Sequence, residues 1–251
     1  MIAVVLAAGS SYRMRPLTDH MPKCLLPIEG KPILEQILQT ISAGGLTDVL
    51  MVTGYQEEMI KEYIQAHPHG MNYRFITNEI YATTSDSVSL YKTKPYAQGQ
   101  EIFLVDADLW FYPGAMNKLL KAQEADIVAI NSKSHLDEEA VKVILDGSSS
   151  RIVEMGKPVD ISRAVGEAVG IRKFSAAYMD KLYRVLERRI VKERILDQVF
   201  EYSVQELLDH GVPLYAVDTC EWPSIEMDTP EDYSRAQKLV AAYEATLRRA
   251  G

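Results

Sequence analysis

Four basic residues follow the first apolar segment of the chain and give the strongest indication of chemistry in the sequence. Residues 3–31 read AVVLAAGSSYRMRPLTDHMPKCLLPIEGK, where a short apolar stretch leads into small residues and then into Arg13, Arg15, Lys23 and Lys31. Small residues let a backbone approach a flat or anionic ligand, and nearby cations neutralise phosphates. The whole chain has a formal net charge of -8. This local excess of positive charge therefore indicates a polyphosphate ligand.

Two pairs of acidic residues are the next candidates. Asp106 and Asp108 follow an apolar segment at residues 102–105, and Glu226 and Asp228 precede the last helix-like segment. Mg²⁺ prefers carboxylate and phosphate oxygens, and α/β sheets bind ligands beyond the carboxyl ends of their strands. An Asp-x-Asp pair on its own is a weak signal because turns are rich in Asp. Asp228 also has an ordinary interpretation as an acid just ahead of a helix.

Other polar residues stand at the ends of predicted elements. Ser85 and Ser87 begin a helix-like segment, where either would also serve as an ordinary N-cap. Lys157 follows a predicted strand and has an alternative interpretation as a solvated loop lysine. Glu167 lies in a stretch flanked by glycines, where it would pair either with a substrate amine or hydroxyl or with Arg172.

Composition and charge exclude several classes of protein. The 251 residues are 47% hydrophobic and 25% charged, as in an ordinary globular protein. The acidic balance argues against non-specific nucleic-acid binding, which needs a broad basic face. No apolar stretch approaches the ~20 residues of a membrane span, and the N-terminus lacks the basic start of a signal peptide. Cys24 and Cys220 are too few for a zinc site or a disulfide framework, so we expect a cytoplasmic enzyme.

Apolar segments that read as strands alternate with amphipathic segments that read as helices. This alternation predicts an α/β fold with three layers, α/β/α, around a mixed, mostly parallel sheet with β-hairpin additions. The sequence DGSS at residues 146–149 is one hairpin signal. We expect a single domain over residues 1–251, because the sequence contains no repeat, low-complexity tract or linker. The expected strands lie at residues 2–6, 49–53, 73–77, 102–105, 127–130, 141–145, 151–154, 169–174 and 214–217, and the expected helices at residues 33–43, 57–67, 87–94, 115–125, 176–193, 203–209 and 230–249.

The first loop contains neither the G-x-x-x-x-G-K-[ST] nor the G-x-G-x-x-G pattern of common phosphate-binding loops. It reads L-A-A-G-x-x-x-R-M-x-P-L-T-x-x-x-P-K-x-L-x-P-x-x-x-K-P from residue 6 to residue 32. This pattern resembles the nucleotidyltransferases that join a nucleoside triphosphate to a sugar phosphate or alcohol phosphate. The two acidic pairs are similar to acidic motifs of the same family. The chain departs from the family at Ser11, where Gly is usual, and at Tyr12, where a small residue is usual.

The resemblance implies a Rossmann-like fold of the nucleotide-diphospho-sugar transferase type and a role for each matched residue. Arg13 would hold the β- and γ-phosphates, and Lys23 the α-phosphate and the incoming acceptor. Asp108 and Asp228 would bind Mg²⁺, with Asp106 and Glu226 as supporting acids. The acceptor would contact Lys157, Glu167 and Ser87, with Lys157 gripping its phosphate as a catalytic residue. The nucleotide would contact Leu6, Ala7, Ala8, Gly9, Ser10, Thr53, Gly54, Tyr55, Asn78 and Ser85.

The segment S-x-S-L-Y at residues 87–91 bears on the substrate. It is similar to the branch of the family that uses CTP with phosphocholine, 2-aminoethylphosphonate or inositol phosphate. The resemblance therefore implies a cytidylyltransferase that joins CTP to a small phosphorylated or phosphonylated alcohol or amine and releases pyrophosphate. Residues 1–130 would form the half that binds the NTP, and residues 131–251 the half that binds the acceptor and closes the site.

Other functions stay open at this point. A sugar-1-phosphate nucleotidyltransferase would use UTP, GTP or dTTP, a glycosyltransferase of similar sheet architecture would release a nucleoside diphosphate, and a non-catalytic subunit would only sense nucleotide or sugar phosphate. Trp110, Trp222 and Tyr81 would form an aromatic cage for a quaternary ammonium or pack in the core. We expect no nucleic-acid partner and no membrane insertion, and the sequence leaves a homodimer open.

Overall fold

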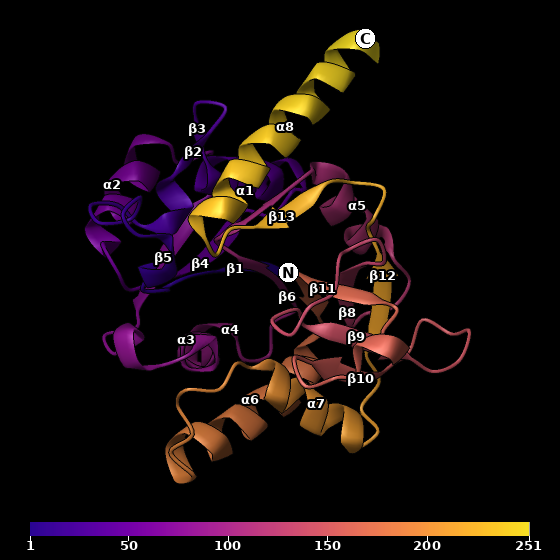
Figure 1. Ribbon diagram of the computed structural model, residues 1–251. Coiled ribbons are helices and arrows are strands. Elements are labelled where there is room, and N and C mark those ends of the chain that lie inside the picture. Colours follow the sequence, from indigo (N-terminus) through magenta and orange to yellow (C-terminus); the bar gives the residue numbers. More distant parts are fainter. Residues whose placement is uncertain (251) are drawn as a thin grey trace.

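The structure of the chain, a computed structural model, describes residues 1–250, with side chains described through residue 246. A central sheet runs through the middle of the molecule and helices cover both of its faces (Figure 1). This arrangement confirms the three-layer α/β/α fold expected from the alternation of apolar segments. Within the described residues, no helix is long and apolar enough to span a membrane.

The central sheet has a parallel part and a mixed part. The strands follow the order β10-β9-β11-β6-β1-β4-β5, while β8 pairs with β11 and β12 pairs with β8. Strands β6, β1, β4 and β5 run parallel, whereas β11 runs antiparallel to β6, β8 and β9. The bounds are β1 (Ile2–Ala7), β4 (Asp48–Thr53), β5 (Asn72–Thr77), β6 (Ile102–Asp106), β8 (Ile127–Asn131), β9 (Lys142–Leu145), β10 (Ile152–Gly156), β11 (Gly166–Phe174) and β12 (Tyr215–Asp218).

An apolar core lies on each face of the sheet. Successive side chains of a strand point to opposite faces, so Ala3 and Val5 of β1 enter one core while Val4 and Leu6 pack in the other. The first core takes its helical side chains from α1 (Ile33–Ala43), α2 (Glu57–Ala66), α5 (Pro113–Lys121) and α8 (Pro230–Ala250). The second takes them from α3 (Asp86–Lys92), α4 (Lys94–Ala97), α6 (Ala176–Glu187) and α7 (Glu201–Asp209). The far end of α8 projects away from the body of the molecule (Figure 1).

The parallel strands end at one edge of the sheet. In the register, Leu6 of β1 lies opposite Asp106 of β6, and Ala7 lies opposite Thr53 of β4. The loops that follow these three strands therefore emerge side by side. This edge is where an open α/β sheet binds its ligands.

A two-stranded ribbon joins the middle of the chain to its end. Strand β7 (Leu109–Phe111) pairs antiparallel with β13 (Ser224–Glu226), and Glu226 lies opposite Leu109. The backbone N–H of Met227 then donates to the carbonyl of Asp108 at 3.1 Å. The ribbon brings the two acidic pairs of the sequence together.

The structure contains several short elements that the sequence pattern did not predict. Strands of two or three residues are too short to show a period of their own, which explains why β7 and β13 were missed. The hairpin predicted around residues 146–149 is confirmed as β9 and β10. The helix expected at residues 176–193 is α-helical to Glu187 and then π-helical. The remaining short elements are β2 (Pro27–Ile28), β3 (Lys31–Pro32), the 3₁₀ turns Tyr12–Met14, Lys23–Leu25, Tyr81–Thr83 and Ile161–Arg163, and the π-helical turn Arg188–Lys192.

Candidate active site

The loop after β1 folds back on itself through Ser11. Ser11 has φ 55, in the left-handed region that favours glycine. Its Oγ accepts a hydrogen bond from the backbone N–H of Lys23 at 3.2 Å, and its carbonyl accepts one from Thr18 Oγ1 at 2.7 Å. Ser11 therefore adopts the conformation of the usual glycine, and its hydroxyl also fixes the start of the segment that carries Lys23.

The bulk of Tyr12 is turned outward. Its side chain is 69% exposed, and the guanidinium of Arg15 lies over the ring, 5.1 Å from the centroid. Arg15 also pairs with Asp19, with 3.4 Å between Nε and Oδ1. Lys31 is exposed on β3. Of the four cations in this region, Arg13 and Lys23 line the cavity described below, whereas Arg15 and Lys31 do not.

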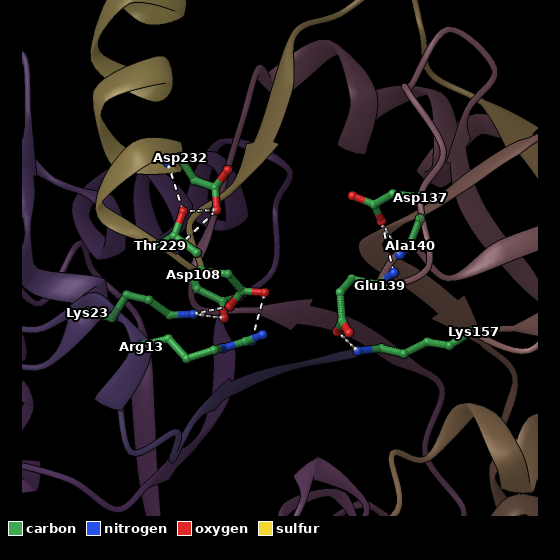
Figure 2. A network of polar contacts seen from close by, with 10 residues as sticks. Arg13, Lys23, Asp108, Asp137, Glu139, Ala140, Lys157, Thr229 and Asp232 are labelled. Carbon is green, nitrogen blue, oxygen red and sulfur yellow. Dashed lines mark hydrogen bonds and ion pairs between the residues drawn. The ribbon is translucent and has the colours of Figure 1, made fainter.

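Arg13 and Lys23 meet two of the predicted acids. Lys23 Nζ lies 2.6 Å from Asp108 Oδ2 and 2.9 Å from Asp228 Oδ1. The Nη2 atom of Arg13 lies 2.9 Å from Asp228 Oδ2. Figure 2 shows both cations reaching toward the same group of carboxylates. Residues more than 200 positions apart in the sequence thus form one charged cluster.

Three carboxylates of this cluster could hold a metal ion. One oxygen from each of Asp108, Glu226 and Asp228 lies within 4.8 Å of the others. Asp108 Oδ1 is buried and has no hydrogen-bond partner among the described residues. Carboxylate oxygens are the ligands that Mg²⁺ prefers. The donor set and the unpartnered oxygen both fit a hard divalent cation.

The charges of the cluster shift the pKa values of its members. Burial would lower the pKa of Lys23, but Asp108 and Asp228 outweigh this effect and raise it well above its usual range. Burial would raise the pKa of Asp228, but the ammonium of Lys23 and then the guanidinium of Arg13 hold it below its usual value. Loss of hydration inside the cleft, followed by the charges of Asp108 and Asp228, raises the pKa of Glu226. The cluster is thus organised around one ammonium that stays protonated.

Asp106 stands apart from these three acids. Its Oδ2 accepts from Arg172 Nη1 at 2.8 Å, and Gly170 on β11 leaves the space for this carboxylate, because an added Cβ would lie 2.6 Å from Oδ2. Burial raises the pKa of Asp106 to about 6 even though Arg172 lowers it. Arg172 also donates to Glu201 at 2.7 Å. The structure therefore places Asp106 in a different charged group from Asp108.

Glu167 does not pair with Arg172 in the structure. Its Oε2 accepts a hydrogen bond from Ser134 Oγ at 2.5 Å. The partners of Arg172 are Asp106 and Glu201 instead. Of the two alternatives left open by the sequence, the pairing with Arg172 is not formed.

The charged cluster opens onto a cavity of about 420 Å³. Of the residues expected to contact the nucleotide, six line this cavity and four do not. Leu6, Ala8, Gly9, Ser10, Asn78 and Ser85 belong to the lining, whereas Ala7, Thr53, Gly54 and Tyr55 lie outside it. Ser87, expected to contact the acceptor, is 4% exposed and also lies outside the lining.

The last residue of β4 and the two residues after it contact α2 and the first loop rather than the cavity. Thr53 Oγ1 donates to Glu57 at 3.0 Å, and Tyr55 OH donates to the carbonyl of Thr18 at 2.9 Å. A Cβ on Gly54 would lie 2.7 Å from the carbonyl oxygen of Ala8 and 2.8 Å from the side chain of Tyr81. Gly54 therefore lets the first loop pack closely against β4.

Lys157 reaches the opposite side of the same cavity. Its Nζ lies 2.8 Å from Glu139 Oε2, and Figure 2 shows this pair across from Arg13 and Lys23. A second cavity of about 700 Å³ adjoins the first and shares Arg13, Glu139 and Asp228 with it.

The aromatic cage considered from the sequence does not form. Trp110 is buried in the core on one face of the sheet, and Trp222 packs against that same core. Tyr81 packs against the core on the other face and lines the 420 Å³ cavity.

Four further charged residues of the lining were not predicted as site residues. Asp86 directly follows Ser85, and that position was the available signal for it. Arg172 was considered only as a partner of Glu167. No local sequence pattern marks Glu139 or Glu201 as a site residue. Glu139 reaches the cavity from a loop and Glu201 from the first turn of α7, so their positions depend on the fold.

Comparisons with known proteins show which family the chain resembles. A model of the MobA-like NTP transferase domain matches residues 3–244. CMP-5'-(3-aminopropyl)phosphonate synthase of Streptomyces rubellomurinus is 28% identical over 244 residues, covering 93% of this chain and 38% of that protein. The chain thus spans well under half the length of this relative. Choline-phosphate cytidylyltransferase of Streptococcus pneumoniae is 22% identical over 248 residues, covering 96% and 98% of the two chains.

The fold has close relatives among solved structures. The inositol-1-phosphate CTP transferase of T. maritima superposes with a TM-score of 0.79 at 21% identity, covering 95% of this chain and 94% of that one. At this level of identity the likeness concerns the fold, including the arrangement of the central sheet and its helices.

Proposed function

The chain belongs to the family of MobA-like NTP transferase domains, and from this premise we propose that it is a Mg²⁺-dependent cytidylyltransferase. It would join CTP to a small phosphorylated or phosphonylated alcohol or amine and release pyrophosphate. The observation that carries this proposal is the meeting of Arg13 and Lys23 with Asp108 and Asp228 at one cavity. The choice of CTP is supported by relatives whose names include CMP or cytidylyltransferase.

The reaction needs positioning and charge neutralisation rather than a covalent intermediate. An anionic oxygen of the acceptor attacks the α-phosphorus in line, the bond from that phosphorus to the bridging oxygen breaks, and pyrophosphate leaves with the bond electrons. No general base is required, because the attacking phosphate or phosphonate oxygen is already deprotonated. Arg13 would hold the β- and γ-phosphates, Lys23 the α-phosphate, and Lys157 the acceptor phosphate.

Asp108, Glu226 and Asp228 would hold the metal ion, on the evidence of their donor geometry and the unpartnered Asp108 oxygen. When bound, Mg²⁺ supplies positive charge that offsets repulsion between the triphosphate and an anionic acceptor. Lys23 contacts two of these carboxylates, so it would stand between the metal-binding acids and the substrate phosphates.

The test is a matrix of the four NTPs against phosphorylated and phosphonylated acceptors, with pyrophosphate release as the measurement. We expect release with CTP and Mg²⁺, and no release in EDTA. Release of a nucleoside diphosphate without pyrophosphate would indicate a glycosyltransferase. Tight NTP binding without turnover of any acceptor would indicate a sensing subunit.

The first loop offers matched control variants for this assay. Arg13→Ala and Lys23→Ala remove cations that line the cavity, whereas Arg15→Ala and Lys31→Ala remove cations of the same segment outside it. We expect the first pair to lose activity by about 100-fold or more and the second pair to keep it. Equal losses in all four variants would contradict the assigned roles.

A further inference from the structure

A second charged group in the cavity has no part in the reaction described above. We define it as the acidic cluster: Asp86, Asp106 and Glu201 around Arg172. Arg172 is 3% exposed and Glu201 4% exposed. Asp86 Oδ1 accepts from the backbone N–H of Phe200 at 3.0 Å, and the Arg172 guanidinium lies 4.7 Å from the centre of the Phe200 ring. All four charged side chains line the 420 Å³ cavity.

The acidic cluster contains more carboxyl groups than cationic groups. Three carboxylates surround one guanidinium, and the guanidinium already pairs with Asp106 and Glu201. Burial, and then the charge of Glu201, raises the pKa of Asp86 well above its usual value. Over the whole lining, eight carboxylate side chains face four cationic ones. A buried excess of like charge is costly unless a counter-charge reaches it.

An unpartnered amide oxygen lines the same cavity. Asn78 is 1% exposed, and its Nδ2 donates to Thr84 Oγ1 and to Ser89 Oγ, each at 3.1 Å. Its Oδ1 is buried and has no hydrogen-bond partner among the described residues. A buried acceptor of this kind is normally paired, so it indicates a ligand that brings an N–H or O–H donor into the cavity.

Charge also determines which chemical group of a ligand can bind at the acidic cluster. The phosphates of an NTP would be repelled by Asp86 and Glu201, and their place is beside Arg13 and Lys23 instead. Glu201 and Lys157 line two cavities in common, the one of about 420 Å³ and another of about 470 Å³. An acceptor whose phosphate binds at Lys157 can therefore direct its other end toward Glu201.

We propose that the acceptor is a zwitterion whose cationic amine binds between Asp86 and Glu201. The inference rests on the proposed function and names the substrate class of the same site: a phosphate or phosphonate at one end and an ammonium group at the other. Asp86 and Glu201 balance the ammonium charge, while Lys157 holds the anionic end. A neutral polyol phosphate brings no cation to these carboxyl groups.

The first experiment compares acceptors with the unmodified protein. 2-Aminoethylphosphonate and 3-aminopropylphosphonate, whose ammonium groups carry N–H donors, are the cationic probes, and glycerol 3-phosphate and inositol 1-phosphate are the neutral ones. Pyrophosphate release with CTP and Mg²⁺ gives kcat/KM, which we expect to be about 10- to 100-fold higher for a cationic probe. An equal or greater value for the neutral probes would overturn the inference while leaving the cytidylyltransferase proposal intact.

Binding measurements keep the inference testable if no probe is turned over. Isothermal titration of the full chain with each probe then reports affinity directly. Tighter binding of the cationic probes would support the acidic cluster as an ammonium site even though the proposed reaction had failed. Equal or weaker binding of the cationic probes would overturn both.

Substitutions in the acidic cluster test whether the preference for cationic probes comes from Asp86 and Glu201. Asp86→Asn and Glu201→Gln should raise KM for the cationic probe by about 10-fold or more, with kcat and the KM for CTP little changed. Asp86→Asn does not touch Arg172, so it serves if Glu201→Gln unfolds the protein. Glu79→Gln is the matched control, because Glu79 pairs with Lys92 outside the cavity. A raised KM for CTP instead would assign Asp86 and Glu201 to the nucleotide.

Discussion

At the scale of single residues, Lys23 is the side chain that joins the two acidic pairs of the sequence. Its ammonium lies within 3 Å of carboxylate oxygens from both acidic pairs, where it balances charges that would otherwise repel each other. Mg²⁺ would bind the same carboxylates, so Lys23 and the metal ion would compete for them. The substrate phosphates offer Lys23 another set of oxygens. Such an exchange would link metal binding to nucleotide binding.

Removing the Lys23 ammonium should expose this competition. In Lys23→Met, Asp108 and Asp228 lose the cation that they share, and we expect the repulsion between these half-buried carboxylates to destabilise the fold by about 1–3 kcal/mol. We expect a lower melting temperature in EDTA than for the wild type. Addition of Mg²⁺ should restore more stability to the variant than to the wild type, as measured by thermal unfolding. An equal Mg²⁺ response in the two proteins would show that Lys23 does not compete with the metal.

At the scale of elements, close packing of the β4 end against the first loop sets the shape of the nucleotide side of the cavity. Gly54 leaves no space for a Cβ between Ala8 and Tyr81, two residues that line the cavity. In Gly54→Ala we expect a loss of stability of about 1–3 kcal/mol and a higher KM for CTP, because the loop must move. Steady-state kinetics and urea unfolding measure the two effects. An unchanged KM for CTP would show that the loop position does not matter for binding.

A polar contact also joins the two helices behind this edge. Glu35 on α1 accepts from Tyr63 on α2 at 2.7 Å, and His69 lies 3.0 Å from the same oxygen. Burial would raise the pKa of Glu35, but these two contacts outweigh it and lower the pKa. A carboxyl group whose folded pKa is lowered stabilises the fold above its unfolded pKa. That stabilisation disappears as the pH falls through the folded pKa.

Glu35→Gln should therefore lose stability in a pH-dependent way. At pH 7 we expect the variant to be about 1 kcal/mol less stable, since a bond to a charged acceptor becomes a bond to a neutral one. The difference from the wild type should shrink as the pH falls below the usual range of a glutamate. Urea unfolding at several pH values measures it. A difference that stays constant down to acid pH would contradict the assigned role of the charge.

At the scale of the whole molecule, the two halves of the chain share one sheet. Strand β11 from the second half pairs with β6 from the first along Phe174–Ile171, and β13 pairs with β7. Helix α8 returns to pack on the core of the first half. The division into an NTP half and an acceptor half stays a prediction about function, and we predict that the two halves unfold together.

Equilibrium unfolding tests this prediction. Helix and sheet content by circular dichroism and the fluorescence of Trp110 and Trp222 should follow one coincident transition in urea. The two tryptophans come from different halves but pack on the same core. Two separate transitions would show that the halves are independent folding units.

The sequence alone determined the features that depend on residues close together in the chain. The alternation of apolar periods predicted the strands of the central sheet and most helices, because each element must bury one face. The residues of the first loop and the two acidic pairs were identified from composition and spacing, together with the resemblance that those patterns carry. Small residues allow a ligand to approach the backbone, and cations nearby in the sequence can neutralise its phosphates. Both effects depend on neighbouring residues, so the sequence indicates them without knowledge of the fold.

Only the tertiary structure decided which side chains meet. The β7–β13 ribbon joins Glu226 and Asp228 to Asp108, while Gly170 and Arg172 on β11 draw Asp106 to Glu201. Neither grouping is encoded within a local window, because each depends on strand register and packing between segments far apart in the chain. Acids two positions apart in the sequence thus enter different charged groups, one suited to a metal ion and the other to a cationic substrate.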